Sequence, residues 1–498
     1  MIRRLLIANR GEIAIRIINA CRELGIESVA VYSEADARAP HALAADSAVA
    51  IGGAQPSKSY LAAPKLIDAA RSAGADAIHP GYGFLSENAG FAAACSDAGL
   101  IFVGPPAEVI ASMGSKIEAR RLMQKAGVPI VPGKTPADQS DEGIQAAIRA
   151  IGFPVLVKAS AGGGGKGMRR VLETSEMAEA IQAARREATA SFSDGTLYVE
   201  RFIEPTRHVE VQLFGDAYGN VVHLFERECS VQRRHQKVIE ESPSPTLAPV
   251  VREKMTSAAV KAAQITGYRN AGTVEFLLEG KGDAASFYFL EMNTRLQVEH
   301  PVTEAVTGVD LVRAQIMVAS GNRLPWAQSD LAQRGHAIEC RIYAENPAQG
   351  FLPQTGRLLL YEEPRMPGVR IDSGVREGSE VTMHYDPMLA KVIATGENRE
   401  VARARAMAAL RAFPILGVHT NIEFLLQILV HERFVTGDMD TGFLDREGNA
   451  LAVTSPGASD AALAVAAAHC NGFRCPEDTL HASNLPSEPW LRLQGWGR

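Results

Sequence analysis

A chain of 498 residues with 46% apolar and 22% charged residues has the composition of an ordinary globular protein, and its length suggests roughly three domains. The net charge of −6 argues against a broad nucleic-acid-binding surface, and no stretch approaches the roughly 20 apolar residues of a membrane span. The six cysteines form no Cys-x-x-Cys pair, which predicts reduced thiols in a cytoplasmic protein.

The first 113 residues alternate short apolar segments with amphipathic ones. Buried strands are predicted at residues 4–8, 29–32, 75–79 and 100–103. Helical stretches separate them, and strands that alternate with helices predict a parallel sheet covered on both faces. The loops at residues 9–11 and 79–83 fall at the carboxyl ends of strands, where such sheets usually bind ligands.

The middle of the chain begins with a predicted helix at residues 115–127 and a proline-rich linker. Residues 130–203 then read as a compact module of helix, strand, glycine loop, strand, helix and strand. Strands dominate residues 204–330, with one predicted helix near residues 251–266, and a mixed segment occupies residues 336–446. These segments predict a chain of mixed α/β and α+β structure.

The glycine loop lies between two predicted strands and contains Gly162, Gly163, Gly164, Gly165, Lys166 and Gly167. Consecutive glycines let backbone N–H groups turn inward around phosphate oxygens, and Lys158 and Lys166 supply positive charge. A flexible hairpin tip is the alternative. A Walker loop would need Ser or Thr after the lysine, and the protein-kinase motifs His-Arg-Asp and Asp-Phe-Gly are missing from the sequence. A nucleotide clamp of another class is therefore predicted.

Residues 291–299 alternate polar and apolar side chains, which places the polar ones on one face of an extended strand. The polar positions are Glu291, Asn293, Arg295, Gln297 and Glu299. A half-exposed strand with a solvated face is the alternative, but such a face favours Lys, Thr and Ser. Carboxylates, amides and a guanidinium are instead groups that hold metal ions, anions and protons.

A second strand-like segment, residues 273–276, carries Glu275 before this row. Two adjacent strands would bring Glu275, Glu291 and Asn293 together as oxygen ligands. Such ligands, with nucleotide phosphates, suit Mg²⁺. A simple ion-paired pair of glutamates is the alternative reading.

Residues 291–304 resemble the signature of biotin carboxylases, which are members of the ATP-grasp superfamily. The resemblance covers about residues 1–446 and includes residues 7–14, 79–88, the glycine loop, 207–210 and 232–237. It implies a pre-ATP-grasp parallel-sheet domain at residues 1–113, an ATP-grasp domain at 114–330, a biotin carboxylase C-terminal domain at 331–446 and a linker or tail at 447–498. Within the ATP-grasp domain, residues 130–203 are expected to form a mobile lid.

The resemblance implies that ATP, bicarbonate and biotin give carboxybiotin, ADP and phosphate through carboxyphosphate. By the same resemblance Glu299 is the base that deprotonates bicarbonate, and Arg295, Gln297 and the Val298 backbone hold that anion. Arg341 resembles the arginine that stabilises the biotin enolate, although a surface strand arginine is its other reading. Tyr82 is expected near biotin, or as a core tyrosine.

The family also implies sites for two Mg²⁺ or Mn²⁺ ions, at Glu275, Glu291 and Asn293. Lys237 is expected near the transferred phosphoryl group, where a fixed cation offsets developing charge. His208 taken alone would be read as structural. The implied ATP contacts are Lys116, Lys158, Gly162, Gly163, Gly164, Gly165, Lys166, Gly167, Glu200, Phe202, His208, Gln232, His235, Lys237 and Leu277.

Lys166, residues 385–391 and the tail resemble the α subunits of acyl-CoA carboxylases of the 3-methylcrotonyl-, propionyl- and geranyl-CoA type. The partners implied by this resemblance are a biotinyl carrier domain or protein and a carboxyltransferase (β) subunit, and a homo-oligomer is implied as well. No Met-Lys-Met motif is present in the sequence, so biotin is expected on a carrier rather than on this chain. Two possibilities remain open, namely a separate carrier protein and a chain that is a fragment of a longer subunit.

Two other functions fit parts of this pattern. Another ATP-grasp carboxylate ligase would share the nucleotide clamp and the metal ligands, and a non-catalytic interaction module would need neither. Glu299 together with Arg295, Gln297 and Arg341 favours bicarbonate and biotin. Because metal and bicarbonate sites need different depths, the strand is expected to end near Asn293 and to continue as a loop into the pocket.

Overall fold

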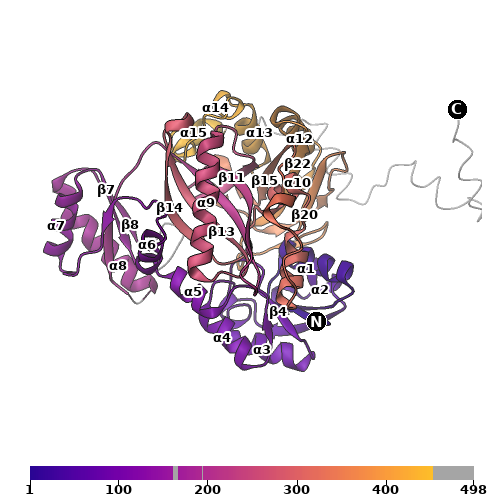
Figure 1. The fold of residues 1–498 in the computed structure, drawn as a ribbon. Coiled ribbons are helices and arrows are strands. Elements are labelled where there is room, and N and C mark those ends of the chain that lie inside the picture. Colours follow the sequence, from indigo (N-terminus) through magenta and orange to yellow (C-terminus); the bar gives the residue numbers. More distant parts are fainter. Residues whose placement is uncertain (161–166, 193, 453–498) are drawn as a thin grey trace, which may run out of the picture.

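Figure 1 presents the computed structural model, which describes residues 1–160, 167–192 and 194–452. The expectations for Gly162 to Gly165, for Lys166 and for the tail beyond residue 452 concern residues outside this described part. No helix among the described residues is long and apolar enough to cross a membrane.

The N-terminal domain is built on a five-stranded parallel sheet in the order β3-β2-β1-β4-β5. Its strands are β1 (Arg4–Ile7), β2 (Glu27–Ser33), β3 (Ser47–Gly52), β4 (Ala77–His79) and β5 (Ile101–Phe102). Its main helices are α1 (Gly11–Leu24), α3 (Ala63–Ser72) and α4 (Ala89–Asp97). Four of the strands and the parallel arrangement were predicted. β3 was not predicted; it is an edge strand whose short apolar segment is mostly exposed, with Ile51 as its buried residue.

The central sheet has eight strands in the order β14-β13-β10-β11-β12-β15-β22-β20. Their bounds are β10 (Thr206–Gly215), β11 (Val221–Arg233), β12 (Gln236–Ser242), β13 (Asn270–Glu279), β14 (Ser286–Asn293), β15 (His336–Tyr343), β20 (Val369–Ser373) and β22 (Met388–Gly396). Since β12 pairs directly with β15, strands of the ATP-grasp segment and of the C-terminal segment share one continuous sheet. Side chains from both segments can therefore meet on one face.

The prediction of one helix within residues 204–330 is wrong, because this stretch, which the structure describes throughout, has three α-helices. These are α9 (Pro249–Thr266), α10 (His300–Thr307) and α11 (Leu311–Ala319). The sequence of α10 contains Pro301 and several β-branched residues, which reads as an extended segment. Pro301 occupies the first turn of the helix, where its missing N–H would have no partner in any case.

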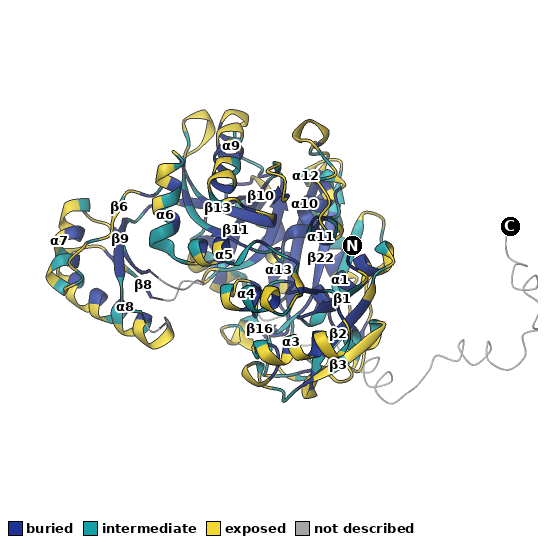
Figure 2. Cartoon of the chain, turned by 60° about the horizontal axis from the view of Figure 1, so that its bottom comes forward, coloured by how far each residue is buried: buried dark blue, intermediate teal, exposed yellow. Residues whose placement is uncertain are grey.

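A separate small unit stands at the left of Figure 1. It consists of a four-stranded sheet in the order β6-β9-β7-β8 and the helices α7 (Asp141–Ile151) and α8 (Met177–Phe192). The strands are β6 (Gly133–Lys134), β7 (Val155–Ala159), β8 (Met168–Val171) and β9 (Leu197–Arg201), and α6 (Lys116–Lys125) lies beside the unit. Figure 2 shows its helices exposed on their outer sides and its sheet largely buried, so the unit has its own core. The order of elements agrees with the module predicted at residues 130–203.

The C-terminal segment packs α12 (Arg399–Arg411) and α13 (Ile422–Val430) around β15 and β22. Its hydrophobic core also contains side chains of β11 and β12, such as Val231 and Ile239. This shared core fixes the position of β15 and β22 relative to the strands that carry the polar row.

Candidate active site

Glu275 and Glu291 lie directly opposite each other in the register of β13 and β14. Thr273 is opposite Asn293, and the Asn293 side-chain amide donates a hydrogen bond of 2.7 Å to Glu275 Oε1. Cross-strand partners in an antiparallel pair have neighbouring side chains. The predicted approach of Glu275, Glu291 and Asn293 is therefore present.

The environment of Glu291 fits a divalent cation. Burial, and then the nearby charge of Glu275, raise the pKa of the Glu291 carboxyl above its usual range. Within the described part of the chain no hydrogen bond or ion pair is found for the Glu291 carboxylate, and the charges of Lys116 and Lys158 offset the effects of burial and Glu275 only in part. A bound Mg²⁺ or Mn²⁺ ion would remove this penalty, and carboxylate and amide oxygens are suitable ligands for it.

One lysine connects three carboxylates at the centre of the site. Lys237 Nζ, on β12, lies 2.6 Å from Glu210 Oε2, 3.0 Å from Glu275 Oε1 and 2.6 Å from Glu299 Oε1. Burial alone would lower the pKa of Lys237, but these three negative charges raise it well above its ordinary value. The ammonium group is therefore permanently charged.

Glu299 lies between two cations. Its second oxygen, Oε2, accepts a hydrogen bond of 2.8 Å from Arg341 on β15. Burial would raise the pKa of Glu299, but Lys237 and Arg341 hold it well below its usual range. Glu299 is thus an ionised carboxylate that can accept a proton.

Arg341 is buried, so its other reading as a surface strand arginine is wrong. Besides Glu299 it forms an ion pair with Glu240 of β12. Arg341 lines a cavity of about 640 Å³ together with Tyr82, Arg295 and Val298. Residues assigned to bicarbonate and biotin by resemblance therefore surround one cavity.

The polar row changes from strand to loop at the predicted position, because β14 ends at Asn293. In the loop that follows, Arg295 Nε donates to Glu87 Oε2 at 2.9 Å and Arg295 Nη2 donates to Asn293 Oδ1 at 3.1 Å. Gln297 Nε2 donates to Glu275 Oε1 at 2.8 Å. Glu299 is then the N-cap residue of α10, so the alternating row is not a single strand face.

Arg227 is a central residue that the sequence analysis missed. Its side chain is fully buried on β11, opposite Glu210 of β10, and all five of its N–H donors have an acceptor. The acceptors are Glu210, Gln212, Thr273, Gln297 and Thr303, at 2.7 to 3.2 Å. The available signal was a run of charged residues inside a strongly β-prone segment between the family-like segments at 207–210 and 232–237.

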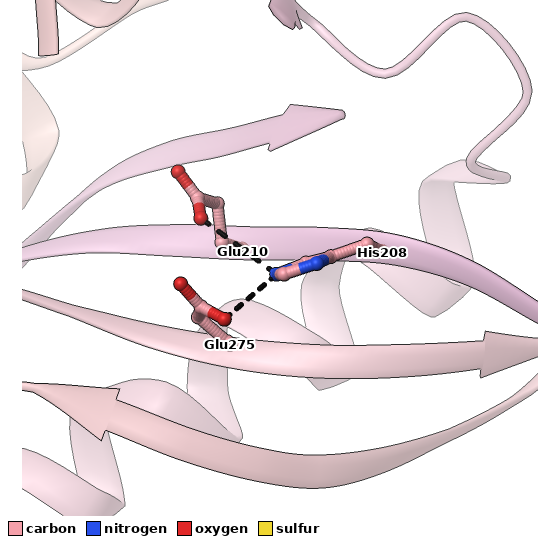
Figure 3. Close-up of side chains that lie close together, drawn as sticks. All are labelled: His208, Glu210 and Glu275. Carbon is pink, nitrogen blue, oxygen red and sulfur yellow. Dashed lines mark ion pairs between the residues drawn. The ribbon is translucent and has the colours of Figure 1, made fainter. Parts of the chain in front are cut away.

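His208 belongs to this cluster and is not an isolated structural histidine. Figure 3 shows its ring pointing between Glu210 and Glu275, with Nε2 at 2.8 Å from Glu275 Oε2 and 3.9 Å from Glu210 Oε2. Burial would lower the pKa of His208, but the charge of Glu275 raises it. His208 therefore adds positive charge on the nucleotide side of Glu275.

A second polar group lies where the small unit meets α6. Lys158 Nζ on β7 is 3.0 Å from Glu200 Oε2 on β9, and Arg120 of α6 also pairs with Glu200. The backbone N–H of Lys116 donates to Ser160 at 3.1 Å. Burial and the charge of Lys158 lower the pKa of Lys116, which shows that the two ammonium groups are close. An anion such as a nucleotide phosphate would relieve this repulsion.

Besides Lys116, whose hydrogen bond is made by its backbone, four expected nucleotide contacts have no side-chain hydrogen bond with these clusters in the described part of the chain. Gln232 is opposite Lys237 in the register of β11 and β12, and His235 lies exposed in the turn between those strands. Phe202 follows β9, and Leu277 is half-buried on β13.

Gly167 is the one residue of the glycine loop that the structure describes. It has φ +70°, and an added Cβ would lie 2.8 Å from the Ala159 side chain. Both the backbone conformation and the close approach of β7 therefore require glycine at this position.

Comparison with known proteins supports the resemblance along the chain. The family "Biotin carboxylase, N-terminal domain" matches residues 1–110, "Carbamoyl-phosphate synthase L chain, ATP binding domain" matches 115–327, and "Biotin carboxylase C-terminal domain" matches 339–446. Biotin carboxylase 1 of Bacillus subtilis is 51% identical over 89% of this chain and 98% of its own length. The α subunit of mitochondrial methylcrotonoyl-CoA carboxylase from Glycine max is 51% identical over 89% of this chain, but the match spans only 60% of that relative.

Solved structures agree with the sequence relatives. The biotin carboxylase domain of the Hydrogenobacter thermophilus 2-oxoglutarate carboxylase, crystallised with MgADP, ADP and bicarbonate, has a TM-score of 0.88 at 44% identity over 92% of this chain and 100% of its own. A biotin carboxylase complex from Campylobacter jejuni has a TM-score of 0.87 at 44% identity over 90% of this chain and 99% of its own. These matches confirm the predicted fold class. The chain belongs to the biotin carboxylase family.

Proposed function

We propose that this chain uses ATP to carboxylate biotin with bicarbonate, through carboxyphosphate. The observation that carries the proposal is the ionised Glu299, held between Lys237 and Arg341 beside the cavity that Arg295, Val298 and Arg341 line. A relative crystallised with MgADP and bicarbonate supports the same pair of substrates. Another ATP-grasp ligase would phosphorylate a carboxylate that is already deprotonated, so it would not need a proton acceptor such as Glu299 between two cations.

The position of Glu299 explains how bicarbonate becomes a nucleophile. While Lys237 and Arg341 both bind Glu299, the carboxylate is a weak base because its charge is already compensated. An incoming anion competes for these two cations, so the pKa of Glu299 rises as the anion binds. Glu299 then takes the bicarbonate proton, and an oxygen of the resulting carbonate attacks the γ-phosphorus of ATP with ADP as the leaving group.

The neighbouring groups serve the later steps. The Lys237 ammonium offsets negative charge on the transferred phosphoryl group, and Arg295 holds the carbonate oxygens with its planar guanidinium. Carboxyphosphate then releases CO₂ and phosphate, the phosphate takes the proton of the biotin ureido nitrogen, and Arg341 stabilises the enolate that attacks CO₂. Glu275, Glu291 and Asn293 would hold two divalent cations, which neutralise nucleotide phosphates when bound.

The biotin is carried by a partner in this proposal. Relatives named as α subunits of methylcrotonoyl-CoA carboxylase support a biotinyl carrier domain or protein, and they support the carboxyltransferase of an acyl-CoA carboxylase as the recipient of carboxybiotin. We further propose a homo-oligomer in the cytoplasm. The small unit at residues 130–203 acts as the mobile lid over ATP, because Lys158 and Glu200 belong to it while Lys237 and Glu275 belong to the central sheet.

The experiment measures ADP release with Mg²⁺, with and without bicarbonate and free biotin. Wild-type protein should cleave ATP only with bicarbonate and faster with biotin, and Glu299→Gln should lower kcat by about 100-fold or more, because the proton acceptor is lost. Glu118→Gln is the matched control, since the Glu118 side chain lies at the surface and pairs with Arg121 on the same helix. ATP cleavage by the wild type that is independent of bicarbonate, or that requires a different carboxylate, would contradict the proposal.

A further inference from the structure

Lys391 is a fully buried lysine whose side chain ends next to the active-site loop. Its Nζ on β22 lies 2.9 Å from the carbonyl oxygen of Val298 and 3.0 Å from Glu12 Oε1, and Asp372 Oδ2 is 3.7 Å away. An ammonium group has three N–H donors, so Val298 and Glu12 use two of them and Asp372 lies at ion-pair distance. The buried ammonium group thus links Val298, Glu12 and Asp372, which belong to three different parts of the fold.

The register of the sheet pairs Lys391 with the active-site arginine. Lys391 is directly opposite Arg341 of β15, and cross-strand partners lie on the same face of a sheet. Arg341 binds the side chain of Glu299, and Lys391 binds the carbonyl of the preceding residue, Val298. Two neighbouring cations thus contact two consecutive residues of the loop.

The loop depends on such contacts because its residues, all of them described, have no regular secondary structure between Asn293 and His300. A peptide unit is planar, so holding the Val298 carbonyl also holds the backbone N–H and the Cα atom of Glu299, from which its side chain starts. Glu299 is at the same time the N-cap residue of α10. The bond from Lys391 therefore restrains the backbone position of the base, while Lys237 and Arg341 bind its carboxylate.

On its other side Lys391 reaches the cavity wall through Glu12. Glu12 lies in the first turn of α1, and the Tyr82 hydroxyl donates a hydrogen bond to its Oε1, the same oxygen that faces Lys391. Tyr82 and Val298 both line the cavity of about 640 Å³. The series Val298, Lys391, Glu12, Tyr82 thus joins one side of the cavity to the other.

We propose that Lys391 is a positioning residue of this active site, which holds the Val298 carbonyl, and through it Glu299, at a fixed place relative to the Tyr82 wall of the cavity. The inference rests on the proposed function and deepens it, because it assigns the geometry of the bicarbonate site to a residue that touches no substrate. A residue with a purely structural role would lower the amount of folded enzyme without changing the substrate concentration it needs.

The test is Lys391→Met, which keeps the length of the side chain and removes its donors. We expect the KM for bicarbonate to rise by about tenfold or more, since small displacements of reacting groups cost up to about 100-fold in rate. The KM for ATP should stay within about twofold, because the nucleotide side of the site lies on other elements. The assay is ADP release under the same conditions as for the wild type.

Two further variants make the result decisive. Lys391→Met combined with Glu12→Gln removes the charge of Lys391 and of one partner together, so it should fold more readily and still show the raised KM for bicarbonate. Arg405→Met is the matched control, because Arg405 donates to the Thr395 carbonyl, also on β22 but outside the loop contacts, at 2.5 Å. Its KM for bicarbonate should equal that of the wild type.

Two outcomes would overturn the positioning role: an unchanged bicarbonate KM in folded Lys391→Met or in the double variant, or failure of both to fold, which would mean that Lys391 serves stability alone. The failure of the proposed function is distinguishable from both, because in that case the wild type itself shows no bicarbonate-dependent ATP cleavage.

Discussion

Charge at the centre of the molecule is balanced residue by residue. Glu210, Glu275 and Glu299 are buried around the Lys237 ammonium, and Arg227 and Arg341 compensate the outer sides of Glu210 and Glu299. Burial of an unpaired charge is strongly unfavourable, so each cation also sets the protonation of its neighbours. Loss of a single ammonium should therefore be visible as a pH effect.

Lys237→Met should shift the acid limb of the pH–rate profile to higher pH. Lys237 is the cation that contributes most to the depressed pKa of Glu299, so without it burial raises that pKa. A protonated Glu299 cannot accept the bicarbonate proton, and the variant should lose kcat/KM for bicarbonate at a pH where the wild type is still active. We expect a displacement of about one pH unit or more.

The measurement follows kcat/KM from about pH 5.5 upward, calculated for the bicarbonate ion present at each pH and with each variant normalised to its own plateau. The depressed pKa of Glu299 places the wild-type limb below this window, so a limb inside it should be seen only in Lys237→Met. Lys281→Met is the control, because Lys281 is exposed and pairs with Asp438 at the surface. An acid limb at the wild-type position in Lys237→Met would mean that Lys237 does not govern the protonation of Glu299.

Sequence patterns found the residues whose neighbours are close in sequence or in a known motif. The pairing of Glu275 with Glu291 followed from two short strands, and the end of the strand at Asn293 followed from the different needs of the two sites. Arg227 and Lys391 were not assigned a role, because the contacts that tie them to the active-site loop span 70 or more positions, to Gln297 for Arg227 and to Val298 for Lys391. A single basic residue in a strand carries no local sign of such a partner.

At the scale of elements, Arg227 joins four parts of the fold around the site. Its guanidinium on β11 binds side chains of β10, β13, the loop after β14 and α10. α10 itself was not predicted, because Pro301 and the β-branched residues of this segment favour an extended conformation in the sequence alone. The orientation of α10 thus depends on a residue far from it in sequence.

Arg227→Met should destabilise the fold by about 3–5 kcal/mol, because it removes the donors to the buried Glu210 Oε1 and Gln297 Oε1 and leaves Lys237 as the hydrogen-bond donor to Glu210. Arg227→Lys should recover only part of this loss, since one ammonium cannot replace five N–H donors in a planar arrangement. Urea unfolding followed by circular dichroism measures both variants, and a loss below about 1 kcal/mol for Arg227→Met would contradict this view.

At the scale of the whole molecule, the small unit and the central body are two parts joined near α6. The residues proposed to contact the nucleotide are divided between them, with Lys158 on the small sheet and Lys237 on the central sheet. The side chain of Arg201, at the end of β9, reaches Glu279 and Tyr288 of the central sheet. A ligand that contacts both parts should bind only when they are close.

ATP with Mg²⁺ should therefore protect the connections of residues 130–203 against limited proteolysis. At a ligand concentration of about 100 times Kd, cleavage through an open state should slow by up to about 100-fold. Sites in the N-terminal domain, such as the exposed segment around Leu61, provide the internal control and should be cut at an unchanged rate. Equal protection of both regions would mean that the two parts do not move separately.

The contact between Lys391 and Val298 has a consequence for how the protein can be divided. Residues assigned to nucleotide and metal come from one uninterrupted stretch, 116–293, whereas the loop at residues 294–299 is bound by Glu87 from the N-terminal part of the chain and by Arg341 and Lys391 from the C-terminal part. A shorter chain containing only the stretch 116–293 would keep Lys237 but would lack Glu299 itself, together with Arg341 and Lys391, which contact residues 299 and 298. The proposed bicarbonate chemistry therefore needs residues from three separate parts of the chain.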